Sequence, residues 1–177
     1  MPNPITITNL GKALVCFERT LLATDSPFDQ YMRSNTSALI DQQVQGMQAF
    51  VQSGCANYHS GSMLSERAGR GRQPQNTTSD TGANGTCFRK PSLRNVVFTA
   101  PCIYSGTLSS LSAVLYFYDP GRGGGPSKPL VSTRQRDPQF PTRVTNKQAI
   151  VAFLTTSYDR TVPAAVPCGL PVGGNIH

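Results

Sequence analysis

The sequence predicts a mostly α domain in which long loops join a few short helices. Four segments repeat apolar residues at helical spacing, and the chain carries 16 glycines and 14 prolines, which predict turns and loops. No alternating run predicts a sheet, although residues 95–98 are expected to be extended. The length of 177 residues suits one domain, and 38% hydrophobic residues suffice for a core.

Each expected helix has an apolar stripe and a start or stop signal. The first stripe is Leu10, Leu14, Phe17 and Leu21, ended by Asp25-Ser26-Pro27, and the second is Ile40, Val44, Met47 and Val51, ended by Ser53-Gly54. The third is Leu108, Leu111, Leu115 and Tyr118, capped by Thr107 and ended by Pro120-Gly121. The fourth is Ile150, Phe153 and Leu154, opened by a capping box of Thr145 and Gln148. Residues 60–86, 120–141 and 163–177 are expected to lack regular structure.

The net charge of +7 favours acidic partners without choosing among nucleic acid, anionic membrane and an acidic redox protein. The densest cluster, Arg67, Arg70 and Arg72, lies in a predicted loop and is interpreted as a solvated surface, because no nucleic-acid recognition fold accompanies it. No apolar run approaches the ~20 residues of a membrane span. Residues 1–8 have no signal-peptide features, so the chain as written is expected in the cytoplasm.

The segment 55–59 carries the most informative chemistry. It reads Cys55-Ala56-Asn57-Tyr58-His59, which is a c-type haem motif, C-x-x-C-H, with Tyr58 at the second cysteine position. In such a motif two thiols bond the haem vinyl groups and the histidine ligates iron. The five cysteines also leave open a zinc site of three Cys and one His, formed by Cys55, His59, Cys87 and Cys102, although its spacing is unfamiliar.

Several further blocks extend this match, and together they resemble the C-terminal haem domain of bacterial di-haem cytochrome c peroxidases and of the related MauG enzymes. The blocks are residues 26–31, 36–39, 45–50, 55–61, 88–95, 99–101, 106–118 and 145–154, in the family's order. The resemblance implies one cytochrome c-like domain over residues 1–177. Residues 1–36 then form a leading interdomain segment, 37–160 the haem-domain core and 161–177 an irregular tail.

The resemblance also implies roles for individual residues. His59 corresponds to the proximal iron ligand and Cys55 to a haem anchor. Tyr118 matches the distal ligand, a tyrosine in the MauG-like branch, and a core aromatic residue is an equal alternative. Arg89 and Arg94 match positions where a guanidinium could pair with haem propionates, or they are ordinary surface charges.

A calcium ion joins the two domains in the family, partly through backbone oxygens that map to Thr99 and Pro101. Its other ligands come from a domain without a counterpart in this chain, so calcium is a secondary expectation. The chain departs from the family pattern at two positions, where Tyr58 replaces a cysteine and Tyr104 replaces a histidine.

By resemblance, the expected function is that of a haem-dependent oxidoreductase domain of cytochrome c peroxidase type. Haem c, held by one thioether, would pass electrons, with hydrogen peroxide as the family's substrate and a small cytochrome c or a cupredoxin as donor. The family is periplasmic. The N-terminal haem domain that cleaves peroxide is missing, so whether this chain is itself an enzyme stays open. The alternative is a haem-free, inactive remnant or structural module.

Overall fold

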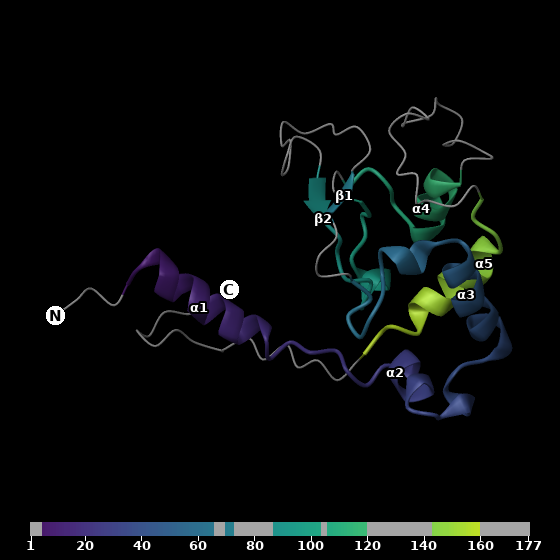
Figure 1. Ribbon diagram of the computed structural model, residues 1–177, viewed down its shortest axis with the longest axis horizontal. Helices are drawn as coiled ribbons and strands as arrows, with labels where there is room; N and C mark the ends of the chain where they lie inside the picture. The colour runs from purple at the N-terminus through teal and green to yellow at the C-terminus, as the bar shows by residue number, and fades with distance from the viewer. Residues whose placement is uncertain (1–4, 66–69, 73–86, 104–105, 120–142, 160–177) are drawn as a thin grey trace.

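The computed structural model describes residues 5–65, 70–72, 87–103, 106–119 and 143–159. These residues form helices α1 (Ile7–Glu18), α2 (Pro27–Met32), α3 (Asp41–Gln52), α4 (Leu111–Tyr118) and α5 (Lys147–Thr155), strands β1 (Arg70–Arg72) and β2 (Cys87–Arg89), and 3-10 turns at Thr36–Ala38, Cys55–Asn57 and Val96–Phe98. Helices α2, α3, α4 and α5 and the two strands form one body, and helix α1 lies apart from it (Figure 1). The mostly α prediction is therefore confirmed.

Helices α3 and α5 pack directly against each other at the centre of the body. Gly46 on α3 faces the backbone of α5, where a Cβ atom at position 46 would lie 1.9 Å from the carbonyl oxygen of Ala149. Phe153 is 2% exposed, and its ring contacts the rings of Phe28 and Phe50 at centroid distances of 5.5 and 5.4 Å. The buried core comprises Ala49, Phe50, Cys55, Leu115, Val144, Ile150, Phe153 and Leu154.

The segment Asp25-Ser26-Pro27 begins a helix, whereas its residue types predicted the end of one. The Ser26 side chain accepts a hydrogen bond from the Asp29 amide, and the Asp29 carboxylate accepts from the Ser26 amide. This reciprocal capping box, with proline at the first helical position, starts α2. The Phe28 amide donates to the Thr156 carbonyl at 3.0 Å, which ties α2 to the end of α5.

Helix α1 was expected to present an apolar stripe and to end at Asp25-Ser26-Pro27. It ends at Glu18 instead, and none of its residues is buried. Leu10, Leu14 and Phe17 are each more than half exposed. The spacing of apolar residues predicted the helix correctly but could not tell what covers its apolar face.

The predicted starts of two helices are wrong. Ser110, rather than Thr107, caps α4, because its side chain accepts from the Ala113 amide. Leu108 instead pairs with Cys102 in an isolated β-bridge. At α5 the Thr145 amide donates to the Ser53 hydroxyl at 3.3 Å, and Asn146, at φ 45°, precedes the helix in place of the expected capping box.

Of the remaining local features, the end of α3 was predicted correctly and two others were not. Helix α3 ends at the expected Ser53-Gly54 signal, with Gly54 in the left-handed region at φ 71°. The expected extended segment 95–98 contains a 3-10 turn instead. The short antiparallel pair of β1 and β2 was not predicted.

Several expectations concern residues outside the described ranges. They include Arg67, Tyr104, the expected loop at 120–141, the expected tail at 161–177 and most of the expected loop at 60–86, while the side chain of Cys87 is likewise not described. Among the described helices, none is long and apolar enough to cross a membrane. The division into residues 1–36, 37–160 and 161–177 stays a prediction.

Candidate functional site

Cys55 and His59 lie on a single turn directly after α3. Gly54 reverses the chain, and residues Cys55–Asn57 then form a 3-10 turn. The His59 amide donates to the Cys55 carbonyl at 2.9 Å. This hydrogen bond joins residues four apart, as in one turn of an α-helix. Residues four apart on such a turn project to the same side. The backbone therefore places Cys55 and His59 on one turn of the chain, and their role in holding haem stays a prediction.

A backbone carbonyl fixes the tautomer of His59. Its Nδ1 lies 3.2 Å from the carbonyl oxygen of Leu64. A carbonyl oxygen only accepts hydrogen bonds, so Nδ1 carries the proton and donates it. A neutral ring protonated at Nδ1 has its lone pair on Nε2, the arrangement that a metal-ligating histidine needs.

The surroundings of His59 also favour the neutral ring. Burial lowers its pKa, and the nearby positive charge of Lys90 lowers it further, while hydrogen bonding to the carbonyls of Leu64 and Pro91 acts in the opposite direction. The net pKa lies below the ordinary value of histidine. A neutral imidazole at pH 7 is the form that ligates a metal ion.

The residue that accepts this hydrogen bond has an unusual backbone conformation. Leu64 has φ 46° and is 5% exposed. A branched L-residue rarely adopts the left-handed region, and such a conformation costs on the order of 1–3 kcal/mol. The Leu93 amide also donates to the Leu64 carbonyl, at 3.4 Å. The surrounding packing thus holds the acceptor of His59 in place against local strain.

Cys55 and Tyr118 interact electrostatically. Burial raises the pKa of the Cys55 thiol to about 11, so it is protonated at neutral pH. Burial also raises the pKa of the Tyr118 hydroxyl, and the charge of a Cys55 thiolate adds to this effect. The residue as a whole remains 37% exposed, so the burial concerns its hydroxyl end. The roles of Cys55 as haem anchor and of Tyr118 as distal ligand stay predictions.

Tyr58, at the second cysteine position, points into the protein. It is 8% exposed, and the Nζ atom of Lys90 lies 4.5 Å from the centroid of its ring. This geometry is a cation–π contact. Lys90 thus acts on both Tyr58 and His59, a role that its sequence context did not predict. The only sequence signal was its place beside Arg89 in one of the matching blocks.

Arg94 is engaged by groups other than a cofactor. Its guanidinium bonds both oxygens of Asp29 at 2.6 Å and the Ser62 carbonyl at 2.7 Å, and the Arg94 and Asp29 side chains are 6% and 15% exposed. The pair clamps α2 to the segment that follows His59. Arg89 is exposed on β2. Propionate binding by either arginine stays a prediction.

Replacing Asp29 with asparagine is expected to destabilise the fold at pH 7 by about 2–3 kcal/mol, because it leaves a buried guanidinium without its partner charge. Burial alone would raise the Asp29 pKa, but hydrogen bonds from Arg94 and Ser26 lower it below the ordinary value. The stabilisation of the fold by Asp29 is therefore complete at pH values above the ordinary pKa of the carboxyl group. It is lost as the pH falls towards the lowered pKa. Urea unfolding at pH 7 and pH 3 measures the difference, and an equal loss at both values would contradict it.

The expected metal ligands outside the haem motif are not gathered into a cluster. Thr99 and Pro101 are exposed, and within the described ranges no three His, Cys, Asp or Glu residues could hold a metal ion together. The zinc alternative thus gains no support from Cys55, His59 and Cys102. Calcium at the backbone oxygens of Thr99 and Pro101 stays a prediction.

The chain is similar in sequence to several known proteins. No family model matches the chain. The cytochrome c551 peroxidase of Pseudomonas aeruginosa is 34% identical over 61% of this chain and 36% of that protein, and the cytochrome c peroxidase Ccp of Escherichia coli is 32% identical over 60% and 26%. The methylamine utilization protein MauG of Methylorubrum extorquens is 30% identical over 92% of this chain and 47% of its own length.

A solved structure has the same fold. A MauG-like protein associated with microbial copper homeostasis superposes on 93% of this chain, and on 57% of its own chain, with a TM-score of 0.73 and 20% identity. The fold is therefore that of a helix-dominated, cytochrome-type domain. The chain belongs to the di-haem cytochrome c peroxidase and MauG family, and it spans about a quarter to a half of the curated relatives described above.

Proposed function

We propose that this chain is a haem-dependent oxidoreductase domain of the cytochrome c peroxidase type that binds haem through Cys55 and His59. The observation that carries the proposal is the single turn that holds these two side chains together, with Nδ1 of His59 bonded to the Leu64 carbonyl. A neutral imidazole and a thiol on one side of the chain fit the requirements of a c-type haem.

Each residue of the site has a separate role in this proposal. Haem, when bound, supplies the one-electron chemistry. His59 would hold the iron through Nε2, and Cys55 would hold the haem through one thioether, formed by addition of its thiol to a haem vinyl group. Tyr58 has no thiol, so its buried ring would contribute packing in place of a second bond to the haem. The hydroxyl of Tyr118, which interacts electrostatically with Cys55, would be the second oxygen or nitrogen group available to hold the iron.

The reaction and its partners are proposed from the relatives. The names of the Pseudomonas and Escherichia proteins identify them as cytochrome c peroxidases. We therefore expect hydrogen peroxide as the oxidant of the complete system and a small cytochrome c or a cupredoxin as the electron donor, in the periplasm. A second haem domain would complete the peroxidase, and calcium bound by Thr99 and Pro101 would lie between the two domains.

Replacing Tyr58 with cysteine is expected to change the number of thioethers from one to two. The protein is produced with an export signal and the c-type maturation machinery, and its haem is examined as the pyridine haemochrome. We expect the wild-type α band to lie at the position of single-thioether haem and the Tyr58→Cys band at that of two-thioether haem. Tyr58→Phe is the matched control, because it keeps the ring and adds no thiol. Identical bands in the wild type and Tyr58→Cys would contradict single attachment.

The second candidate function is a haem-free structural module. The burial of Tyr58 favours it, since an aromatic ring 8% exposed fills space inside the protein beside the attachment turn. This candidate predicts a colourless protein that unfolds cooperatively without cofactor. A colourless wild type together with a haem-loaded Tyr58→Cys variant would favour the structural module and reject our proposal for the native chain.

A further inference from the structure

The backbone of Lys90 is tied to the segment that holds the imidazole of His59. The Ser65 hydroxyl donates to the Lys90 carbonyl at 2.8 Å. One residue before Ser65, the Leu64 carbonyl bonds Nδ1 of His59 and also accepts from the Leu93 amide at 3.4 Å. Hydrogen bonds on both sides of Lys90 thus fix its backbone beside the turn that carries the proposed iron ligand.

The side chain of Lys90 is held over the ring of Tyr58. Its Nζ atom lies 4.5 Å from the ring centroid, and Tyr58, which directly precedes His59, is 8% exposed. An ammonium group is attracted by the face of an aromatic ring, and the attraction strengthens where water is excluded. Among the causes that lower the pKa of His59, burial is the largest and the charge of Lys90 follows, so the field of this charge reaches the imidazole.

A fixed positive charge beside an iron ligand affects the reduction of the iron. Reduction of ferric haem to ferrous haem takes up one electron, which a small donor protein supplies in the proposed function, and removes one positive charge from the iron. A positive charge nearby therefore favours the ferrous form. At an effective dielectric constant of about 20, a unit charge on the order of 10 Å from a site changes such an equilibrium roughly 10-fold.

We propose that Lys90, held over the ring of Tyr58, keeps a positive charge beside His59 and so raises the reduction potential of the haem that His59 would hold. This inference rests on the proposed function. It gives a second role to Tyr58, the residue that replaces the second cysteine of the haem motif. Tyr58 is a positioning residue, because it acts through Lys90.

A potentiometric titration of the matured haem protein tests this proposal. The protein is reduced with dithionite in the presence of redox mediators, and the α band gives the midpoint potential. Lys90→Met is expected to lower the equilibrium constant for reduction at least about 3-fold, which is a fall of about 28 mV, since a tenfold change corresponds to about 59 mV for one electron. Lys90→Arg keeps the charge and the cation–π contact, so its potential is expected to match that of wild type.

Variants of Tyr58 separate its positioning role from a merely structural one. Tyr58→Leu removes the ring face and is expected to lower the potential when Lys90 is present. In the Lys90→Met background, where there is no charge to hold, the same substitution is expected to cause no further fall. Tyr58→Phe keeps the ring and is expected to keep the wild-type potential.

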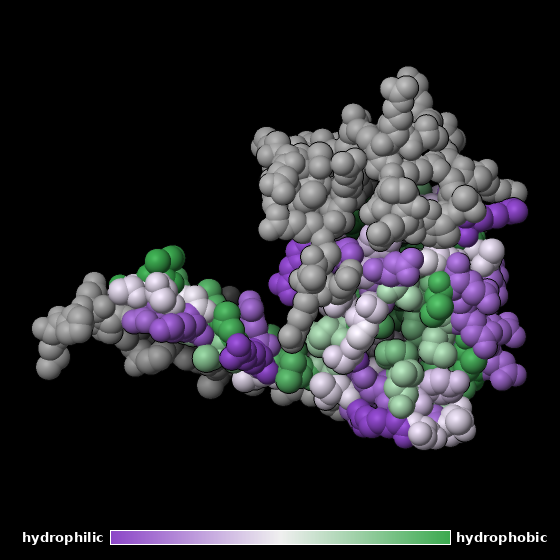
Figure 2. Space-filling model, viewed as in Figure 1, coloured by the Kyte–Doolittle hydropathy of each residue, from purple (hydrophilic) through white to green (hydrophobic). Residues whose placement is uncertain are grey.

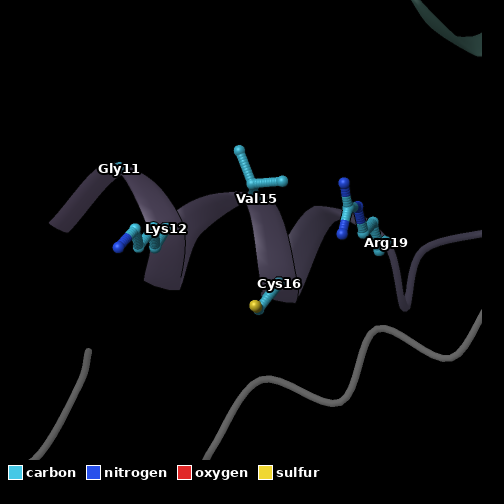
Figure 3. Close-up of a pocket in the computed structure, with 5 residues that line it drawn as sticks. All are labelled: Gly11, Lys12, Val15, Cys16 and Arg19. Atoms are coloured by element: carbon cyan, nitrogen blue, oxygen red, sulfur yellow. The ribbon is translucent and has the colours of Figure 1, made fainter. Parts of the chain in front are cut away.

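Lys12→Met is the matched control, because it removes the same charge far from the site. Lys12 is exposed on α1, whose surface lies away from the body in Figure 2. Figure 3 shows it beside a shallow hollow whose other lining residues are Gly11, Val15, Cys16 and Arg19. Solvent and salt screen a charge at such a position, so the potential of Lys12→Met is expected to equal that of wild type.

Three outcomes would overturn the inference while leaving the haem site in place. They are equal potentials of wild type and Lys90→Met, an equal fall in Lys12→Met, and a fall caused by Tyr58→Leu that is as large in the Lys90→Met background as in wild type. A wild type that matures without a haem band would instead overturn the proposed function, and this inference with it. The thermal unfolding transition of each variant checks that it is folded.

Discussion

Replacing His59 with alanine is expected to weaken the binding of ferric haem to the apoprotein by more than 100-fold. Loss of an outer partner of a metal ligand typically costs roughly 10- to 100-fold in affinity, and the ligand itself is worth more. Titration of the apoprotein, followed at the Soret band, gives the affinity. Added imidazole is expected to restore part of the spectrum, because it supplies the missing nitrogen lone pair.

The neighbouring residue Asn57 offers a matched control. It is exposed on the same turn, and its replacement with alanine removes no proposed ligand. Asn57→Ala is therefore expected to bind haem as wild type does. If His59→Ala and Asn57→Ala bind haem equally well, His59 is not the iron ligand.

Replacing Gly46 with alanine is expected to destabilise the body by about 3 kcal/mol or more, at the upper end of the effects of overpacking. A Cβ atom would lie 1.9 Å from the Ala149 carbonyl oxygen and 2.9 Å from Cβ of Phe153, so α3 and α5 must move apart. For a chain of this size, the loss corresponds to a fall in Tm of about 6–12 °C. Thermal unfolding followed by circular dichroism at 222 nm measures it.

Gly11→Ala is the control for this prediction, because Gly11 is also helical but a Cβ atom added there would have no neighbour within 4 Å. It is expected to leave the Tm of the body unchanged. A Tm for Gly46→Ala within about 2 °C of wild type, that is, a loss below about 1 kcal/mol, would contradict the close contact of α3 and α5.

The parts of the fold that the sequence predicted well are those that depend on local patterns. The apolar spacing of α3 and the Ser53-Gly54 stop located that helix and its end. The start of α2 was misread, because Ser, Asp and Pro cap helices as readily as they end them. The exposure of α1 could not be predicted, since an apolar stripe does not state what covers it.

In the candidate site, too, local features could be predicted from the sequence and contacts between distant segments could not. The sequence singled out Cys55 and His59 by their spacing, and the structure adds that a backbone hydrogen bond places them on one turn. The carbonyl of Leu64 could not be foreseen as the partner of His59, since it depends on a backbone conformation that leucine rarely adopts. Lys90 contacts Tyr58 across a long separation in sequence, which no local pattern predicts. The pairing of Arg94 with Asp29 likewise joins segments distant in sequence.

The most direct test of the central claim is the mass of the matured protein after acid–acetone extraction, followed by mapping of its peptides. We predict one haem retained per chain, carried by the peptide that contains Cys55, and none retained when Cys55 is replaced with serine. A wild-type chain that loses its haem on extraction, or a Cys55→Ser chain that keeps it, would contradict covalent attachment through Cys55.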